Sequence, residues 1–220
     1  MQEIFEGVYK INSQIATINL VPGKKTANEK IVVKNRIEYR IWDPYTSKPA
    51  AAIKNGLKVF PVKRGMKILY LGFASGKTAT YFSDIIGGNG IIYGIEISAD
   101  VLKESLNACE ERKNMIPILA DARKIDEYKH LILDKVDLIY EDIADPDMIR
   151  ILKINAKEFL KKDSFAMIAI KSQCINSVEK PKVVYEKCLK ELSQEFEIID
   201  KRELDPYEIA HLFVVLKYKA

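Results

Sequence analysis

A glycine-containing loop that follows an apolar run is the feature of this 220-residue chain that most directly suggests chemistry. The apolar run 67–71 leads into residues 72–78, with the sequence GFASGKT, and a helical pattern follows. Glycine lets the backbone turn sharply between a strand and a helix and come close to a bound ligand. The loop therefore predicts a nucleotide-like ligand, and three ligand classes compete.

Two of these classes carry phosphates and fit the loop poorly. A P-loop has four residues between its two glycines, whereas here three residues separate Gly72 from Gly76. A dinucleotide site has glycine at the position of Ala74, where the backbone must approach a pyrophosphate. S-adenosylmethionine carries no phosphate, so the looser Gly-x-x-x-Gly turn is sufficient for it.

Two carboxylates that end the next apolar runs favour the third class. Glu96 lies 20 residues after Gly76, where it can accept hydrogen bonds from both ribose hydroxyls. Asp121 ends the following run, where it can accept a hydrogen bond from the adenine amino group. Each carboxylate alone would fit an ordinary helix cap equally well. Together with the glycine loop they predict an S-adenosylmethionine site.

The apolar pattern indicates the elements that must position these groups. Five continuous apolar runs alternate with helical patterns, which predicts a buried parallel sheet in an α/β fold. Two last runs around an Asp-Pro turn are typical of an antiparallel pair. Short β-rich runs fill the first fifty residues, and a helix is expected from Ser47 to about residue 60. The runs are 68–71, 91–95, 116–119, 136–140 and 165–170, then 196–201 and 211–217, and near the start 4–11, 14–20, 30–34 and 37–42.

Composition narrows the class of protein. The chain has 35 basic and 31 acidic residues, and residues 44–83 contain seven basic residues and no acidic one, which suggests a surface that faces a polyanion. Three scattered cysteines and two histidines predict no metal site. No apolar run approaches the ~20 residues of a membrane span. We expect a soluble cytoplasmic protein that has no targeting segment and does not contact membranes.

Several longer motifs resemble the fibrillarin family over nearly the whole chain, in its shorter archaeal form. They are residues 39–53 (YRIWDPYTSKPAAAI), 68–76 (ILYLGFASG), 136–144 (VDLIYEDIA), 167–171 (MIAIK) and 205–207 (DPY) before His211. The resemblance implies a Rossmann-like class I methyltransferase fold with a mostly parallel seven-stranded sheet. A small antiparallel β domain would span residues 1–50 and the methyltransferase domain residues 51–220.

The resemblance also implies an activity and partners. A family member uses S-adenosyl-L-methionine to methylate ribose 2′-hydroxyls of rRNA and tRNA as the catalytic subunit of a box C/D ribonucleoprotein. A guide RNA selects the target, a Nop-domain scaffold protein binds the enzyme, and a kink-turn-binding ribosomal-type protein completes the particle. Two alternatives stay open: a stand-alone methyltransferase, and a catalytically silent scaffold subunit, because Lys77 and Asp145 depart from the family's usual Thr and Gln.

The family's catalytic tetrad corresponds to Lys48, Asp142, Lys171 and His211. A ribose hydroxyl is a very weak acid, so we expect Lys171 to act as a base, Asp142 to orient it, and Lys48 and His211 to position ribose and phosphate. The expected cofactor-binding residues are Gly72, Ala74, Gly76, Lys77, Thr78, Glu96, Ile97, Asp121, Ala122, Asp142, Ile143, Ala144 and Asp145.

Overall fold

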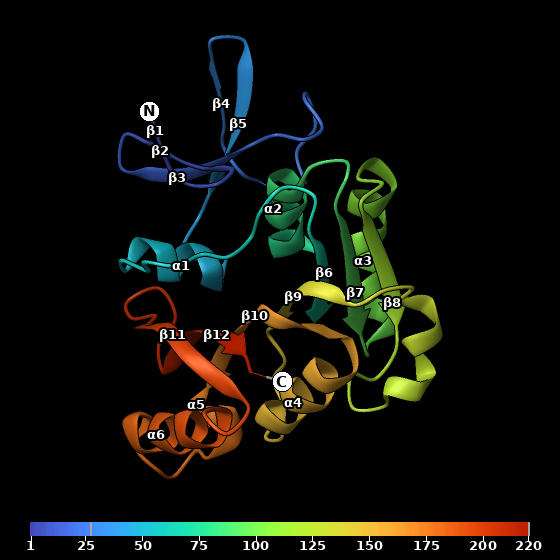
Figure 1. Ribbon diagram of the computed structural model, residues 1–220. Helices are drawn as coiled ribbons and strands as arrows, with labels where there is room; N and C mark the ends of the chain where they lie inside the picture. Colours follow the sequence, from blue (N-terminus) through green and yellow to red (C-terminus); the bar gives the residue numbers. More distant parts are fainter. Residues whose placement is uncertain (27, 220) are drawn as a thin grey trace.

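The later apolar runs form a mixed seven-stranded sheet with the order β11-β12-β10-β9-β6-β7-β8 (Figure 1). The structure is a computed structural model that describes residues 1–26 and 28–219. The five strands β6 to β10 all run parallel to one another, and β12 runs antiparallel to both β10 and β11, as the sequence predicts. The strands are β6 (Lys67–Leu71), β7 (Ile91–Glu96), β8 (Met115–Leu119), β9 (Val136–Glu141), β10 (Leu160–Lys171), β11 (Phe196–Glu203) and β12 (His211–Tyr218).

Helices cover both faces of this sheet. One core cluster joins it to α1 (Lys48–Lys54), α2 (Lys77–Ile86) and α3 (Ala99–Glu111). A second cluster on the other face joins it to α4 (Met148–Phe159) and α6 (Pro181–Leu192). The short α5 (Ser172–Ile175) follows β10, and two 3₁₀ turns, η1 (Ile125–Glu127) and η2 (Lys129–Leu131), follow β8. Among the described residues, no helix is long and apolar enough to cross a membrane.

The N-terminal segment forms a separate antiparallel sheet with the order β1-β2-β3-β5-β4. Its strands are β1 (Gln2–Phe5), β2 (Val8–Ile11), β3 (Gln14–Ile18), β4 (Ile31–Lys34) and β5 (Ile37–Trp42). The single strand expected over 4–11 was wrong, because Gly7 turns the chain there with a φ of 72° and its N–H donates to Glu3 Oε1 at 2.8 Å. Residues 4–11 therefore contribute to two strands.

The helix expected to reach about residue 60 is shorter. It begins after Ser47 as predicted, but α1 ends at Lys54. Gly56 has a φ of 84°, its N–H donates to Ile53 O, and the Leu57 N–H donates to Ala52 O. This left-handed glycine closes the last turn and stops the helix.

The two sheets share a hydrophobic core. Val8, Ile15 and Trp42 of the N-terminal sheet belong to the same buried cluster as Phe82 of α2 and Val215 of β12. The domain boundary expected at residue 50 falls inside α1. That boundary stays a prediction, since the packing continues across it.

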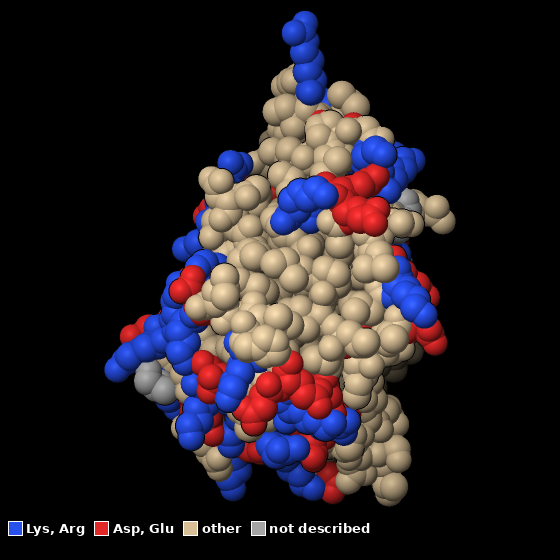
Figure 2. All heavy atoms as spheres, turned by 90° about the vertical axis from the view of Figure 1, so that its right-hand side faces the viewer, with Lys and Arg blue, Asp and Glu red and all other residues tan. Residues whose placement is uncertain are grey.

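The acid-free window 44–83 does not form one surface. Lys67 begins β6 and pairs with Asp134, whereas Lys48 pairs with Asp142, just past the carboxyl end of the neighbouring parallel strand β9. On the face shown in Figure 2, basic and acidic side chains intermingle around a wide uncharged area. A charge count along the chain thus overestimates how far these cations gather in space.

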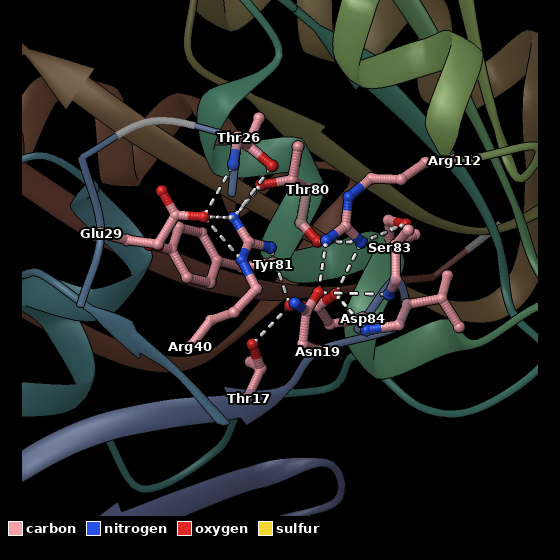
Figure 3. Close-up of polar contacts among 12 residues, drawn as sticks. Thr17, Asn19, Thr26, Glu29, Arg40, Thr80, Tyr81, Ser83, Asp84 and Arg112 are labelled. Atoms are coloured by element: carbon pink, nitrogen blue, oxygen red, sulfur yellow. Dashed lines mark hydrogen bonds and ion pairs between the residues drawn. The ribbon is translucent and has the colours of Figure 1, made fainter. Parts of the chain in front are cut away.

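A buried polar cluster joins the N-terminal sheet to α2 and α3 (Figure 3). At its centre Asp84 of α2 accepts hydrogen bonds from Arg40 Nη1 at 2.8 Å, Arg112 Nη1 at 2.6 Å and Thr17 Oγ1 at 2.6 Å. Arg40 also donates to Glu29 Oε1 at 2.9 Å and lies over the Tyr81 ring. Since both arginines are almost fully buried, their charges depend on these carboxylates.

We expect Asp84→Asn to lower the free energy of unfolding by roughly 3–5 kcal/mol, because it leaves two buried guanidinium groups short of one negative charge. Urea unfolding measures this change. Asp100→Asn is the matched control, since Asp100 is almost fully exposed and pairs with Lys103 on the same helix. If Asp84→Asn lowered the free energy of unfolding as little as the control does, the cluster would not stabilise the fold as described.

Candidate active site

The carboxyl ends of the five parallel strands β6 to β10 line a cavity of about 310 Å³. In register, Leu71 at the end of β6 lies opposite Ile95 of β7 and Glu141 of β9, so the residues that follow meet at one edge of the sheet. Ligands of open α/β sheets bind at this edge, where the strand order reverses. The lining residues are Gly72, Ala74, Ile95, Glu96, Ile97, Ala120, Asp121, Ala122, Arg123, Asp142, Ile143, Ala144, Asp145, Ile151 and Lys171.

The loop after β6 passes close to the loop after β9. Gly72 has a φ of 80°, and a Cβ at this position would lie 2.9 Å from the carbonyl oxygen of Asp142. Glu96 holds the same loop, because Oε2 accepts a hydrogen bond from Ala74 N at 2.8 Å and Oε1 accepts one from Ser98 N at 3.0 Å. Each carboxylate oxygen can accept a further bond, so Glu96 can still bind hydroxyl groups.

Arg123 is a cavity residue that the sequence analysis missed. Its guanidinium donates to Asp121 Oδ1 at 2.9 Å and lies 3.4 Å from Asp145 Oδ2. This guanidinium holds the pKa of the Asp121 carboxyl below its usual range. The only signal in the sequence is that Arg123 lies two residues after Asp121. The pair with Asp145 depends on the packing of two loops.

Ten of the thirteen expected cofactor residues line the cavity, and the other three lie at the start of α2. Gly76 precedes this helix with a φ of 71°. Lys77 lines a different hollow with Glu104 and Glu111. Thr78 Oγ1 donates to Ser47 Oγ at 3.1 Å, next to Lys48. A part in cofactor binding stays a prediction for all thirteen residues.

Asp142 lies between two lysines that are far apart in the sequence, Lys48 of α1 and Lys171 of β10. Lys48 Nζ is 3.2 Å from Asp142 Oδ2, and Lys171 Nζ is 2.9 Å from Asp142 Oδ1. Lys171 Nζ also donates to the carbonyl oxygen of Asp142 at 2.9 Å. The structure therefore brings together three of the four residues expected in the tetrad.

His211 begins β12 directly opposite Lys171 in the β10–β12 ladder. Residues opposite each other on neighbouring strands project from the same face of a sheet. The His211 ring is held by Nδ1, which lies 2.8 Å from the carbonyl oxygen of Ile209. The fourth tetrad residue thus lies beside Lys171, with its ring tied to the loop before β12.

The two lysines differ in how many carboxylates hold their charge. Burial disfavours the charged ammonium of Lys48, but Asp142 and Glu208, whose Oε1 is 3.4 Å away, outweigh burial and raise the pKa of Lys48. Lys171 shares Asp142 with Lys48 and has no other ion pair among the described residues. Two carboxylates therefore hold the charge of Lys48, whereas Lys171 pairs with one among the described residues.

Glu141 is a second carboxyl beneath the site, and it is fully buried. Neither of its side-chain oxygens has a hydrogen-bond partner in the described part of the chain. Burial raises the pKa of Glu141 well above its ordinary value of 4.5, an effect that Lys171 opposes. Burial therefore favours the protonated form of Glu141.

We expect Glu141→Gln to gain stability over the unsubstituted protein as the pH rises. The folded state keeps a proton on Glu141 that the unfolded state loses above pH 4.5, so the unsubstituted protein loses stability with rising pH, by up to about 1.4 kcal/mol per pH unit. Urea unfolding between about pH 5 and pH 8 measures the difference. The exposed Glu104→Gln is the control, and a pH-independent difference for Glu141→Gln would show that Glu141 is charged when buried.

Comparison with known proteins agrees with this geometry. A profile of the fibrillarin family matches residues 1–220. The fibrillarin-like rRNA/tRNA 2′-O-methyltransferase of Pyrococcus furiosus is 49% identical over 219 residues, which cover 97% of this chain and 96% of that protein.

Two solved structures share the whole architecture. Aeropyrum pernix fibrillarin, solved with natively bound S-adenosyl-L-methionine, has a TM-score of 0.87 and 41% identity over 95% of this chain and 92% of that one. A fibrillarin in complex with Nop5p has a TM-score of 0.90 and 38% identity over all of both chains. With a family profile and a relative that each span nearly its whole length, this chain belongs to the fibrillarin family.

Proposed function

We propose that this protein uses S-adenosyl-L-methionine to methylate ribose 2′-hydroxyls of RNA, as the catalytic subunit of a box C/D ribonucleoprotein. The observation that carries the proposal is the Asp142 carboxylate, held between Lys48 and Lys171 at the mouth of a cofactor-sized cavity. The Pyrococcus furiosus relative is named for this reaction on rRNA and tRNA. The Aeropyrum pernix structure supports the choice of cofactor.

The cavity suits this cofactor chemically. S-adenosylmethionine, when bound, supplies an electrophilic methyl group on a positively charged sulfur. The cavity offers the carboxylates of Glu96, Asp121, Asp142 and Asp145 together with apolar side chains such as Ile97 and Ile143. Carboxylates stabilise positive charge and accept hydrogen bonds from hydroxyl and amino groups. Glu96 would hold the ribose hydroxyls and Asp121 the adenine amino group.

Lys171 is the group that would take the proton of the target 2′-hydroxyl. Lys48, Asp142 and Lys171 together carry one net positive charge when both lysines are protonated, so loss of one proton neutralises the group. Lys48 keeps its proton because Glu208 is a second carboxylate partner. The neutral Lys171 amine then accepts the hydroxyl proton as the oxygen becomes a nucleophile.

Lys48 and His211 would position the RNA strand. The Lys48 ammonium remains charged and can contact a phosphate, while Asp142 and Glu208 fix its direction. His211 lies across the ladder from Lys171, so its other ring nitrogen, Nε2, would bind the sugar or phosphate next to the reacting hydroxyl. Positioning of this kind raises the rate because it replaces a random encounter by a fixed approach.

The partners form part of the proposal. The complex of a fibrillarin with Nop5p supports binding to a scaffold of that kind. A guide RNA would select rRNA and tRNA targets by base pairing, and a kink-turn-binding protein would complete the particle. Action in the cytoplasm, as expected from the sequence, belongs to the same proposal.

We expect Lys171→Ala and Lys171→Arg both to lower the single-turnover rate of RNA methylation by roughly 10²–10⁴-fold. Arginine keeps the positive charge but cannot lose its proton, so the Lys171→Arg variant distinguishes a role as a base from a role as a simple cation. The assay uses guide-paired RNA in the reconstituted particle, with cofactor affinity measured by calorimetry as a check on folding. Lys162→Ala is the matched control, because Lys162 is exposed at the other end of β10.

An active Lys171→Arg variant would contradict the assignment of Lys171 as the base. Equal methylation of free RNA without guide or scaffold would instead favour a stand-alone enzyme. A protein that fails to bind S-adenosylmethionine at all would favour a catalytically silent subunit.

Gly72→Ala should weaken S-adenosylmethionine binding at least about tenfold, because the added methyl group meets the Asp142 backbone and the left-handed φ is strained. Calorimetry measures the affinity. Gly56→Ala has the same kind of φ, 84°, but nothing within 4 Å of the new Cβ. We expect this control to lose some stability and to keep its cofactor affinity, and equal affinities for the two variants would argue against a cavity shaped by Gly72.

A further inference from the structure

Two tyrosines form an exposed aromatic pair next to the proposed reactive centre. Tyr45 is 67% exposed although it is a large aromatic residue. Its ring lies 4.9 Å from the ring of the half-buried Tyr207, at an angle of 74°. An exposed aromatic face beside a polar site is a common means of binding a flat ring of a ligand.

The backbone holds both rings in place. Asp43 Oδ1 accepts a hydrogen bond from Tyr45 N at 3.0 Å and so closes the turn that carries Tyr45. Tyr207 N donates to the Leu204 carbonyl oxygen at 2.9 Å, within the loop that joins β11 to β12. Tyr207 also packs against the buried cluster on this face of the sheet. The backbone segments that carry the pair are therefore held by contacts within the chain.

The same two segments carry tetrad residues. Tyr45 lies three residues before Lys48, and Tyr207 precedes Glu208, which pairs with Lys48 at 3.4 Å. Two residues after Tyr207 in this loop, the carbonyl oxygen of Ile209 holds the His211 ring. Figure 1 shows α1 lying next to the β11–β12 loop. A strand that presents a ribose to Lys171 must therefore pass close to both tyrosines.

A hollow of about 450 Å³ adjoins the pair and shares no lining residue with the cofactor cavity among the described residues. Tyr45 and Tyr207 line it together with the exposed Lys30 and Lys54 and with two acidic residues, Glu29 and Asp43. Trp42 is also a lining residue, and its buried Nε1 donates to no acceptor in the described part of the chain. Aromatic rings with basic side chains around them match the bases and phosphates of a nucleic acid strand.

We propose that Tyr45 and Tyr207 bind, by stacking, a base of the RNA strand next to the target ribose, with Lys54 facing its backbone phosphate. This inference rests on the proposed function and adds a nucleotide subsite to it. Every base has a flat face, so such a subsite tolerates any sequence. This tolerance suits an enzyme whose targets are chosen by base pairing with a guide.

Target RNA that carries 2-aminopurine beside the target nucleotide tests the subsite in the reconstituted particle. Stacking on Tyr45 quenches 2-aminopurine, and we expect Tyr45→Ala to lose the quench and to raise KM for the RNA about tenfold. The variant should keep its kcat and its KM for S-adenosylmethionine within about twofold, because neither depends on stacking. Tyr45→Phe restores the ring and should restore both readouts.

Val33→Ala is the matched control, since Val33 is also 67% exposed but lies on β4 away from the hollow. An unchanged quench and KM in Tyr45→Ala would overturn the subsite while leaving the proposed function intact. Weaker scaffold binding with an unchanged KM for RNA would also overturn it, and would assign the pair to a protein contact. If the unsubstituted particle failed to methylate RNA, the proposed function would fall, and the fluorescence would still decide whether the pair stacks on a base.

Discussion

One carboxylate shared by two ammonium groups is the constraint on which the proposed chemistry depends. Asp142 has to be within reach of Lys48 and Lys171 at once, although these residues are 123 positions apart in the chain. Lys171 arrives at the end of a central strand, and Lys48 at the first turn of α1. Glu208 adds a second carboxylate to Lys48 alone, and this asymmetry separates the fixed cation from the proton acceptor.

The buried cluster around Asp84 supports this geometry from the other side of the molecule. Arg40 binds Asp84 and lies in β5, the strand that leads through a short turn to Lys48. Two residues later Trp42 stacks on Tyr81 of α2 with ring centroids 5.0 Å apart. The N-terminal sheet is thereby fixed to α2, which follows the cofactor loop. The sheet positions a tetrad lysine, so its contribution to the site goes beyond stability.

Local patterns in the sequence predict the elements well, and tertiary contacts explain the rest. Apolar runs on both faces predicted the parallel strands, and carboxylates at strand ends predicted the cavity edge. Three features could not be predicted, because each depends on which segments meet in space: the turn at Gly7, the pairing of Arg123 with Asp145, and the burial of Glu141 without a hydrogen-bond partner among the described residues. The charge window fails for the same reason, since Lys67 begins β6 and pairs with Asp134, whereas Lys48 of α1 pairs with Asp142 past the other end of the neighbouring strand β9.

The pH dependence of the single-turnover methylation rate, measured on guide-paired RNA with saturating cofactor, tests the shared carboxylate most directly. The account predicts a rate that rises as one group loses its proton and then levels off, because only the neutral Lys171 amine can accept the hydroxyl proton. It also predicts that Asp142→Asn shifts this rise to lower pH while reducing the plateau, since the lysines lose their common counter-charge. A rate that does not change with pH would contradict the account.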